Sequence, residues 1–155
     1  MHSKSTNWRQ SVTGILIKDK KVLLARHTYG TGENMLLSPG GYVNFGESPQ
    51  DALKREFMEE TKIEIEPLDI IGIRFNMHDW YIAFRAEYIS GTPLSDHNEN
   101  SEVLWVDTNE ALSRNDVPVI TKSLIESALL EKSGLISCKE YEEDMKYAPY
   151  SLFRI

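Results

Sequence analysis

Apolar and β-branched residues come in short runs along this chain, and polar or glycine-containing turns separate the runs. Such runs predict strands, and the first two are expected to form a hairpin across the polar turn Lys18-Asp19-Lys20. The expected strands span residues 9–17, 22–25, 42–45, 63–75, 80–89 and 103–106. Loops are expected over 28–34, which contains two glycines, and over the polar stretch 95–101.

Two longer segments have apolar residues at helical spacing. In the clearer one, Ser48 suits the N-cap, Pro49 the first helical position, and Asp51 the acidic place of a capping box. The expected helices span 48–61 and 117–132, with the start of a short one over 109–113. Strands mixed with two main helices predict an α/β or α+β fold with a mixed β-sheet between helices.

The length of 155 residues fits one domain over 1–155 better than two. The single cysteine, Cys138, excludes an internal disulfide and a cysteine-built zinc site. A reducing cytoplasm is therefore the expected compartment. No stretch is apolar enough to span a membrane, and the N-terminus lacks the apolar core of a secretory signal, so no membrane partner is expected.

The net charge is −7 and the sequence pI is about 5.1. This balance argues against a nucleic-acid partner, because such proteins usually carry a basic stripe. It still permits a small phosphorylated substrate, provided that metal cations stand between the phosphates and the acidic side chains.

Acidic residues gather in one segment, 47–66, which holds seven acids and only three bases. Most runs of charged residues form a solvent-exposed face of a helix. The helical wheel of this segment argues against that interpretation. With Leu53 at zero and about 100° per residue, Glu60 falls near −20°, Glu56 near −60° and Glu59 near −120°. Phe57 falls near +40°, so burying Leu53 and Phe57 brings carboxylates toward the core.

Buried carboxylates repel one another and are costly unless something compensates their charge. A divalent cation does this economically, and Mg²⁺ favours carboxylate oxygens while bridging to substrate phosphates. The wheel therefore predicts a metal site formed by Glu56, Glu59 and Glu60.

The segment from Gly41 to Ile63 resembles the Nudix box, whose pattern is G-x5-E-x7-R-E-U-x-E-E-x-G-U with U a bulky aliphatic residue. Its fixed positions are held by Gly41, Glu47, Arg55, Glu56, Glu59, Glu60 and Ile63, and Phe57 stands at the central U. The box covers 23 of the 155 residues, and Pro39-Gly40 is similar to the usual approach to it.

The resemblance implies a Nudix α/β/α sandwich that hydrolyses a nucleoside diphosphate linked to another group. It implies that Glu56, Glu59 and Glu60 bind Mg²⁺ or Mn²⁺ and that Glu47 adds to the metal site or supports its ligands. It also implies that Arg55 orients these carboxylates through ion pairs.

Two glycines at the start of the box, Gly40 and Gly41, would let the backbone come close to substrate phosphate, and Gly41 also to the metal. A plain turn is the alternative reading of this pair. The departure from the family pattern is Lys62, which stands where the family has glycine. A helix often ends in a left-handed residue, so lysine is expected to strain the helix end by about 1 kcal/mol.

A second acidic patch, over 96–102, precedes the strand that holds Trp105. Several Nudix enzymes have a metal-binding or general-base glutamate in this loop, and Glu99 is the better candidate for it. Glu102 is expected to be a surface or ion-pair residue. Candidates for contacts with the substrate are Arg9 and Arg26, which suit phosphates, and Tyr42, which suits stacking on a ring.

The sequence leaves the substrate open between a nucleotide sugar or ADP-ribose type of compound and an oxidised or normal nucleoside triphosphate. A non-catalytic nucleotide-sensing domain is the alternative from another class, although such domains usually lose box glutamates. A homodimer is possible, and the tail over 135–155 is expected to cover either the core or a partner subunit.

Overall fold

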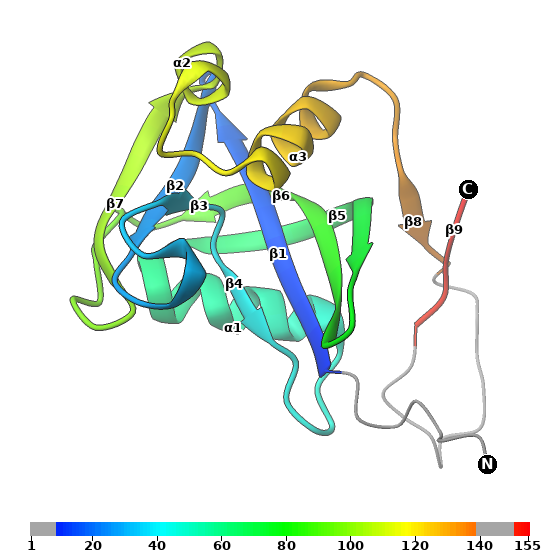
Figure 1. Cartoon of the computed structure of the whole chain (residues 1–155). Coiled ribbons are helices and arrows are strands. Elements are labelled where there is room, and N and C mark those ends of the chain that lie inside the picture. Colours follow the sequence, from blue (N-terminus) through cyan, green and yellow to red (C-terminus); the bar gives the residue numbers. More distant parts are fainter. Residues whose placement is uncertain (1–8, 139–150) are drawn as a thin grey trace.

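A mixed β-sheet lies between helices on its two faces (Figure 1). The structure is a computed structural model that describes residues 9–138 and 151–155. The strands are β1 (Arg9–Lys18), β2 (Lys21–His27), β3 (Leu36–Leu37), β4 (Gly40–Tyr42), β5 (Glu64–Phe75), β6 (Asp79–Ser90), β7 (Asn100–Asp107), β8 (Leu135–Ser137) and β9 (Phe153–Arg154). The helices are α1 (Pro49–Thr61), α2 (Thr108–Ser113) and α3 (Val119–Leu129), and a 3₁₀ turn covers Gly30–Gly32.

Strand β1 is the centre of the sheet. It pairs with β2 and β4 in antiparallel fashion and with β6 in parallel, so the sheet is mixed as predicted. The strand order is β3-β2-β1-β6-β5-β8-β9, with β7 on the outside of β2. The predicted hairpin of the first two strands is confirmed.

Two apolar cores form because alternate residues of β1 point to opposite faces of the sheet. Val12 and Leu16 pack with Leu53 and Phe57 of α1, whereas Ile15 packs on the other side with residues of α2 and α3. This arrangement, with α1 on one face and α3 on the other (Figure 1), confirms the predicted α/β/α sandwich.

The start of the box forms a strand earlier than the sequence predicts. Strand β4 covers Gly40–Tyr42 rather than 42–45, because Gly40 and Gly41 pair with Thr13 and Val12 of β1. The chain then turns, and the Asn44 N–H donates to a Glu47 carboxylate oxygen at 3.0 Å.

The other predicted elements need only small corrections. Strand β7 starts at Asn100, inside the expected polar loop. Helix α3 is shorter than the expected 117–132, since Pro118 precedes it and the Arg85 guanidinium binds the carbonyl oxygens of Ala128 and Leu130 at its end (2.9 and 3.0 Å).

The tail is described in part. Phe153 lies in an edge-to-face contact with buried Phe84, with ring centroids 5.6 Å apart, so this residue covers the core. Its other aromatic residues, Tyr141, Tyr147 and Tyr150, lie outside the described residues. Among the helices of the described ranges, none has the length and hydropathy needed to cross a membrane.

Both ends of α1 follow the sequence. The Ser48 Oγ accepts a hydrogen bond from the Asp51 N–H at 3.1 Å, and Pro49 is the first helical residue. Lys62 ends the helix in the left-handed region, with φ 62° and ψ 19°. Its ammonium donates to the Glu59 carbonyl oxygen at 3.1 Å. Lys62, which has a Cβ, therefore adopts the left-handed conformation at the position where the Nudix pattern has glycine.

Replacing this cap with glycine should stabilise the protein. In Lys62→Gly, relief of about 1 kcal/mol of left-handed strain outweighs the lost lysine hydrogen bond and the extra freedom of glycine in the unfolded chain. We expect a net gain of about 0.5 kcal/mol in the free energy of unfolding, measured by urea denaturation. The control Lys54→Gly, in mid-helix, should lose about 1 kcal/mol, and equal losses in both variants would contradict the strain argument.

Candidate active site

Strand β4 lies directly against the carboxylates of α1. A Cβ on Gly41 would stand 2.5 Å from the Glu56 carboxylate, and a Cβ on Gly40 would collide with the Val12 carbonyl oxygen. The Gly40 N–H donates to Glu60 Oε1 at 3.2 Å. Only glycine allows this approach, so the sheet edge and the acidic face of the helix form one surface.

Glu60 is the most enclosed acid of the helix, with only 3 % of its surface exposed. Among the described residues, its carboxylate accepts one hydrogen bond, from Gly40. Burial raises the pKa of Glu60 to about 8, and the charges of Glu56, Glu99 and Asp96 add to the rise. The wheel therefore placed Glu60 correctly beside the apolar stripe.

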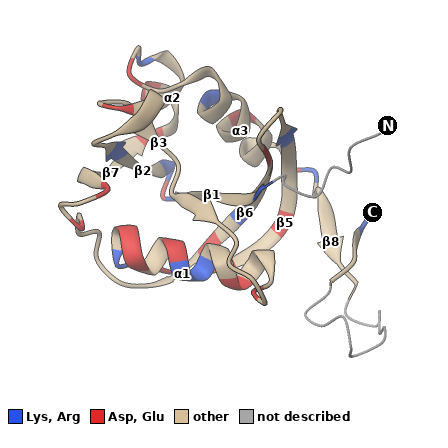
Figure 2. Cartoon of the chain, turned by 60° about the horizontal axis from the view of Figure 1, so that its bottom comes forward, with Lys and Arg blue, Asp and Glu red and all other residues tan. Residues whose placement is uncertain are grey.

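Acidic and basic residues lie side by side along α1 (red and blue in Figure 2), and the Arg55 guanidinium binds three of the nearby acids. Its Nε and Nη2 donate to the two oxygens of Glu47 at 2.8 and 3.0 Å, and its Nη1 donates to Glu56 Oε1 at 2.7 Å and Glu59 Oε2 at 3.3 Å. Its Nη2 also reaches the Tyr42 carbonyl oxygen at 3.0 Å. This one guanidinium links three acids to the end of β4.

The acids around Arg55 differ in their electrostatics. Hydrogen bonds from Arg55 lower the pKa of Glu47, so this residue stays ionised. Burial raises the pKa of Glu56 although Arg55 opposes the rise. The Glu59 side chain is 60 % exposed and faces solvent. Glu59 is thus at the rim, Glu60 is enclosed, and the Glu47 and Glu56 side chains lie between them, 16% and 12% exposed.

The second acidic loop stands near the inner pair. Charge on Glu99 is one cause, after burial, of the raised pKa of both Glu56 and Glu60. Burial is the main cause of the raised pKa of Tyr29, and the charge of Glu99 adds to that rise. The structure therefore brings Glu99 to the box helix, as the sequence predicts.

The predicted substrate contacts fall in different places. The Arg9 guanidinium lies over the Tyr42 ring, 5.1 Å from its centroid, beside β4. Arg26 instead binds Glu102 at 2.5 Å and Asp116 at 3.1 Å, and donates to the Asn34 carbonyl oxygen. The guanidinium of Arg26 is thus occupied within the protein, and Glu102 is the ion-pair residue that the sequence predicts.

A hollow of about 480 Å³ adjoins the glycine pair. It is lined by Ser11, His27, Thr31, Leu37, Ser38, Gly40, Gly41, Tyr42, Arg74, Asp79, Tyr81 and Ile120, and we call it the inner hollow. An outer hollow of about 580 Å³ shares four of these residues and adds Arg9, Asn76, Met77 and His78. Each hollow is within the size range of small-molecule sites.

Several residues at this surface were not predicted from the sequence. Tyr81 is partly buried, and burial is the first cause of its raised pKa, although hydrogen bonds from Thr13 and Ser38 oppose the rise. Burial likewise lowers the pKa of His27, whose ring stacks on Tyr29. These residues come together only through the pairing of β1 with β2, β4 and β6.

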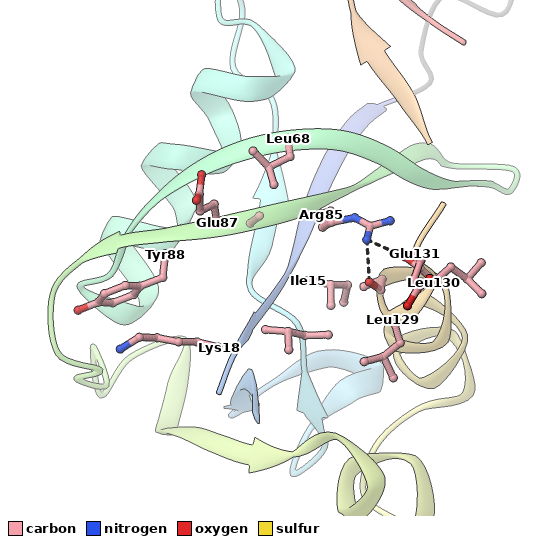
Figure 3. A pocket seen from close by; sticks show the side chains of 12 residues that line it. Ile15, Lys18, Leu68, Arg85, Glu87, Tyr88, Leu129, Leu130 and Glu131 are labelled. Carbon is pink, nitrogen blue, oxygen red and sulfur yellow. Dashed lines mark hydrogen bonds between the residues drawn. The ribbon is translucent and has the colours of Figure 1, made fainter. Parts of the chain in front are cut away.

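A third hollow, of about 500 Å³, lies between β6 and the end of α3 (Figure 3). The two basic side chains of this hollow already have partners. Arg85 pairs with Asp69 and donates to a carbonyl oxygen of α3, and the Lys18 ammonium lies over the Tyr88 ring. It contains none of the predicted site residues.

The donors near the box suit a hard divalent cation. They are carboxylate oxygens, which Mg²⁺ and Mn²⁺ prefer, and Glu60 is enclosed with a single backbone partner. Across residues 9–138 and 151–155, no three His, Cys, Asp or Glu side chains are already arranged as a metal site. Arg55 contributes to this, since it occupies an oxygen of Glu56 and one of Glu59.

Comparison with known proteins agrees with this geometry. A family model described as the NUDIX domain matches residues 8–126. The chain belongs to the Nudix family.

Among its Nudix relatives is a protein of Vibrio atlanticus named NAD-capped RNA hydrolase NudC, 32% identical over 119 residues. The match covers 72% of this chain and 42% of the relative, so the chain spans less than half of that protein. A NUDIX hydrolase from Nitrosomonas europaea shares the fold, with a TM-score of 0.74, 19% identity, and coverage of 84% and 77% of the two chains. A MutT protein from Methanosarcina mazei gives a TM-score of 0.66 at 27% identity, covering 80% and 94%.

Glu60→Gln should change how stability depends on pH in the metal-free protein. The pKa of Glu60 is about 8 in the folded chain and near 4.5 when unfolded, so the folded state holds a proton between these values. Stability therefore falls as pH rises from about 4.5 to 8. Glutamine cannot ionise, so the variant should match the wild type at pH 4.5 and exceed it by roughly 2–4 kcal/mol at pH 9.

Unfolding free energies from urea denaturation in EDTA at these two pH values test this. The matched control is Glu59→Gln, because the Glu59 side chain is mostly exposed. A pH-independent difference between Glu60→Gln and the wild type would contradict the buried-carboxylate argument.

Proposed function

We propose that this Nudix hydrolase uses Mg²⁺ or Mn²⁺ to cleave a nucleoside diphosphate linked to another group, with a dinucleotide such as NAD as the first candidate. The observation that carries the proposal is the enclosed Glu60 carboxylate, which meets β4 through Gly40 beside the inner hollow. Burying the Glu60 carboxylate beside other acids is unfavourable without a compensating charge. A divalent cation would supply that charge and would also bind a phosphate of the substrate.

In this proposal Glu56, Glu59 and Glu60 hold the cation, and the backbone at Gly41 leaves room for it and for phosphate. Arg55 and Glu47 would support these ligands, since the Arg55–Glu47 pair uses nitrogens other than the one that contacts Glu56 and Glu59. A divalent ion at this place supplies charge neutralisation of the diphosphate and lowers the pKa of water.

The residues of the chain do the rest of the chemistry. Glu99 takes a proton from the water that attacks phosphorus. A new P–O bond forms, and the bridging P–O bond of the diphosphate breaks. The products are a nucleoside monophosphate and the phosphorylated form of the other group. Arg9 stands beside β4 to bind phosphate of the substrate.

Two observations favour a dinucleotide as the substrate. The inner and outer hollows are contiguous through Thr31, Tyr42, Arg74 and Asp79, which offers room for both halves of such a substrate. The relative named NAD-capped RNA hydrolase NudC points to the same bond class. A small nucleotide remains the proposed partner, since the acidic balance does not favour an RNA chain.

A product-resolved hydrolysis screen with Mg²⁺ and with Mn²⁺ tests the proposal. It covers NAD, ADP-ribose, nucleotide sugars, and normal and oxidised nucleoside triphosphates. We expect NAD-type compounds to give two monophosphates and Glu60→Gln to lose at least about 100-fold in kcat, as a buried ligand would. The matched control is Glu66→Gln, an exposed acid paired with Lys54, which should keep activity.

Release of pyrophosphate from a triphosphate, with no cleavage of dinucleotides, would favour the triphosphate alternative instead. If nothing turns over but a nucleotide raises the melting temperature, the chain would be a sensing domain. The cytoplasmic location and the homodimer stay predictions.

The site of the substrate can be tested separately. Tyr42 lines both contiguous hollows and is half exposed, so Tyr42→Ala should raise KM about five-fold or more while kcat changes little. Leu129→Ala, in the third hollow, is the control and should leave KM unchanged. The reverse pattern in steady-state kinetics would assign the substrate to the third hollow.

A further inference from the structure

The loop that carries Glu99 is attached to the last turn of α1. Asn100 is fully buried, and its Nδ2 donates to the Glu60 carbonyl oxygen at 3.0 Å. The Leu94 N–H donates to the next carbonyl, of Thr61, also at 3.0 Å. Carbonyls at a helix end have no partner inside the helix, so the loop supplies those partners and is fixed to the helix by them.

Asp96 fixes the loop from within. Its Oδ1 accepts hydrogen bonds from the N–H groups of Asn98, Glu99 and Asn100 at 2.9, 3.0 and 3.1 Å. The Ser95 Oγ donates to the Asn100 carbonyl oxygen at 2.9 Å. These hydrogen bonds to one carboxylate oxygen therefore hold the backbone on both sides of Glu99 in a fixed conformation.

Thr28, the residue that follows strand β2, also binds the backbone at Glu99. The Thr28 N–H donates to the Glu99 carbonyl oxygen at 3.1 Å, and the Thr28 Oγ donates to the Asn98 carbonyl oxygen at 2.7 Å. Both the N–H and the carbonyl of Glu99 thus have partners, although the residue lies in an exposed polar loop.

Packing alone does not account for Asn100. Its Oδ1 is buried and has no hydrogen-bond partner among the described residues. An unsatisfied buried acceptor is destabilising, and an apolar residue would avoid it. What the amide does provide is the bond from Nδ2 to the helix that bears Glu56 and Glu60.

We propose that Asp96 and Asn100 are positioning residues, which hold Glu99 at a fixed place relative to Glu60 at the end of the box helix. This inference rests on the proposed function, in which Glu99 acts on the water. Asn100 joins the loop to the helix, and Asp96 fixes the backbone conformation at Glu99. Neither residue contacts the substrate in this proposal. Such placement matters because a displacement of about 1 Å can cost two orders of magnitude in rate.

A matched pair at Asp96 separates position from charge. Asp96→Asn keeps an oxygen that accepts from the three N–H groups, so its kcat should stay within about three-fold of the wild type. Asp96→Ala removes the acceptor and should lower kcat at least about ten-fold, with KM within about two-fold. If Asp96→Asn loses as much as Asp96→Ala, the charge acts directly and the proposal is wrong.

A double-mutant cycle tests whether Asn100 acts through Glu99. Asn100→Ala should lower kcat about ten-fold in the wild type but little further in Glu99→Gln, because the group that it positions is gone. Thr121→Val, a buried polar residue of α3, controls for general loss of stability and should keep kcat. Additive losses in the cycle would overturn the proposal.

Amide hydrogen exchange gives a readout that needs no activity. Asp96→Ala should lose protection at Asn98, Glu99 and Asn100, whereas Asp96→Asn keeps it. Unchanged protection in Asp96→Ala would overturn the proposal. If the wild type cleaves no diphosphate-linked nucleoside yet these exchange differences appear, the proposed function fails and the placement of Glu99 stands.

Discussion

The enclosure of Glu60 on the apolar side of α1 is the constraint on which the site depends. Leu53 and Phe57 must pack against β1, and the helical repeat then carries Glu60 into the same interface. Burial raises the pKa of Glu60 there, and the charges of Glu56, Glu99 and Asp96 add to the rise. Among the described residues, a backbone N–H from Gly40 is the partner of the Glu60 carboxylate, while the Arg55 guanidinium binds the neighbouring Glu56.

Three segments outside α1 meet at this helix: two lie just before it in sequence, and the third, the loop before β7, comes much later. Strand β4 contributes bare backbone, because a side chain at Gly41 would displace the Glu56 carboxylate. The turn before α1 contributes Glu47, which fixes Arg55. The loop before β7 contributes an acid, Glu99, and the hydrogen bonds that hold it. The single positive charge of Arg55 offsets part of the negative charge of the three acids that it contacts, Glu47, Glu56 and Glu59.

The cation-free protein and the working enzyme would differ in the partners of Arg55. Its Nη1 holds Glu56 and Glu59, the same groups that the proposal gives to the metal. Its bidentate pair with Glu47 uses other nitrogens and can persist. This division explains how one guanidinium both stabilises the acids without a cation and keeps the helix in place with one.

The sequence by itself determined the α/β class, the extent of α1 with its Ser48 cap, and the placing of Glu56 and Glu60 beside Leu53. These follow from local periodicity and capping, which act within a few residues. The structure alone decided that β4 starts at Gly40, that Arg26 pairs with Glu102 and Asp116, and that Asn100 joins the Glu99 loop to Glu60. It also decided which residues line the hollows. Those contacts join residues up to 90 positions apart, where strand order and register, rather than local pattern, set the neighbours.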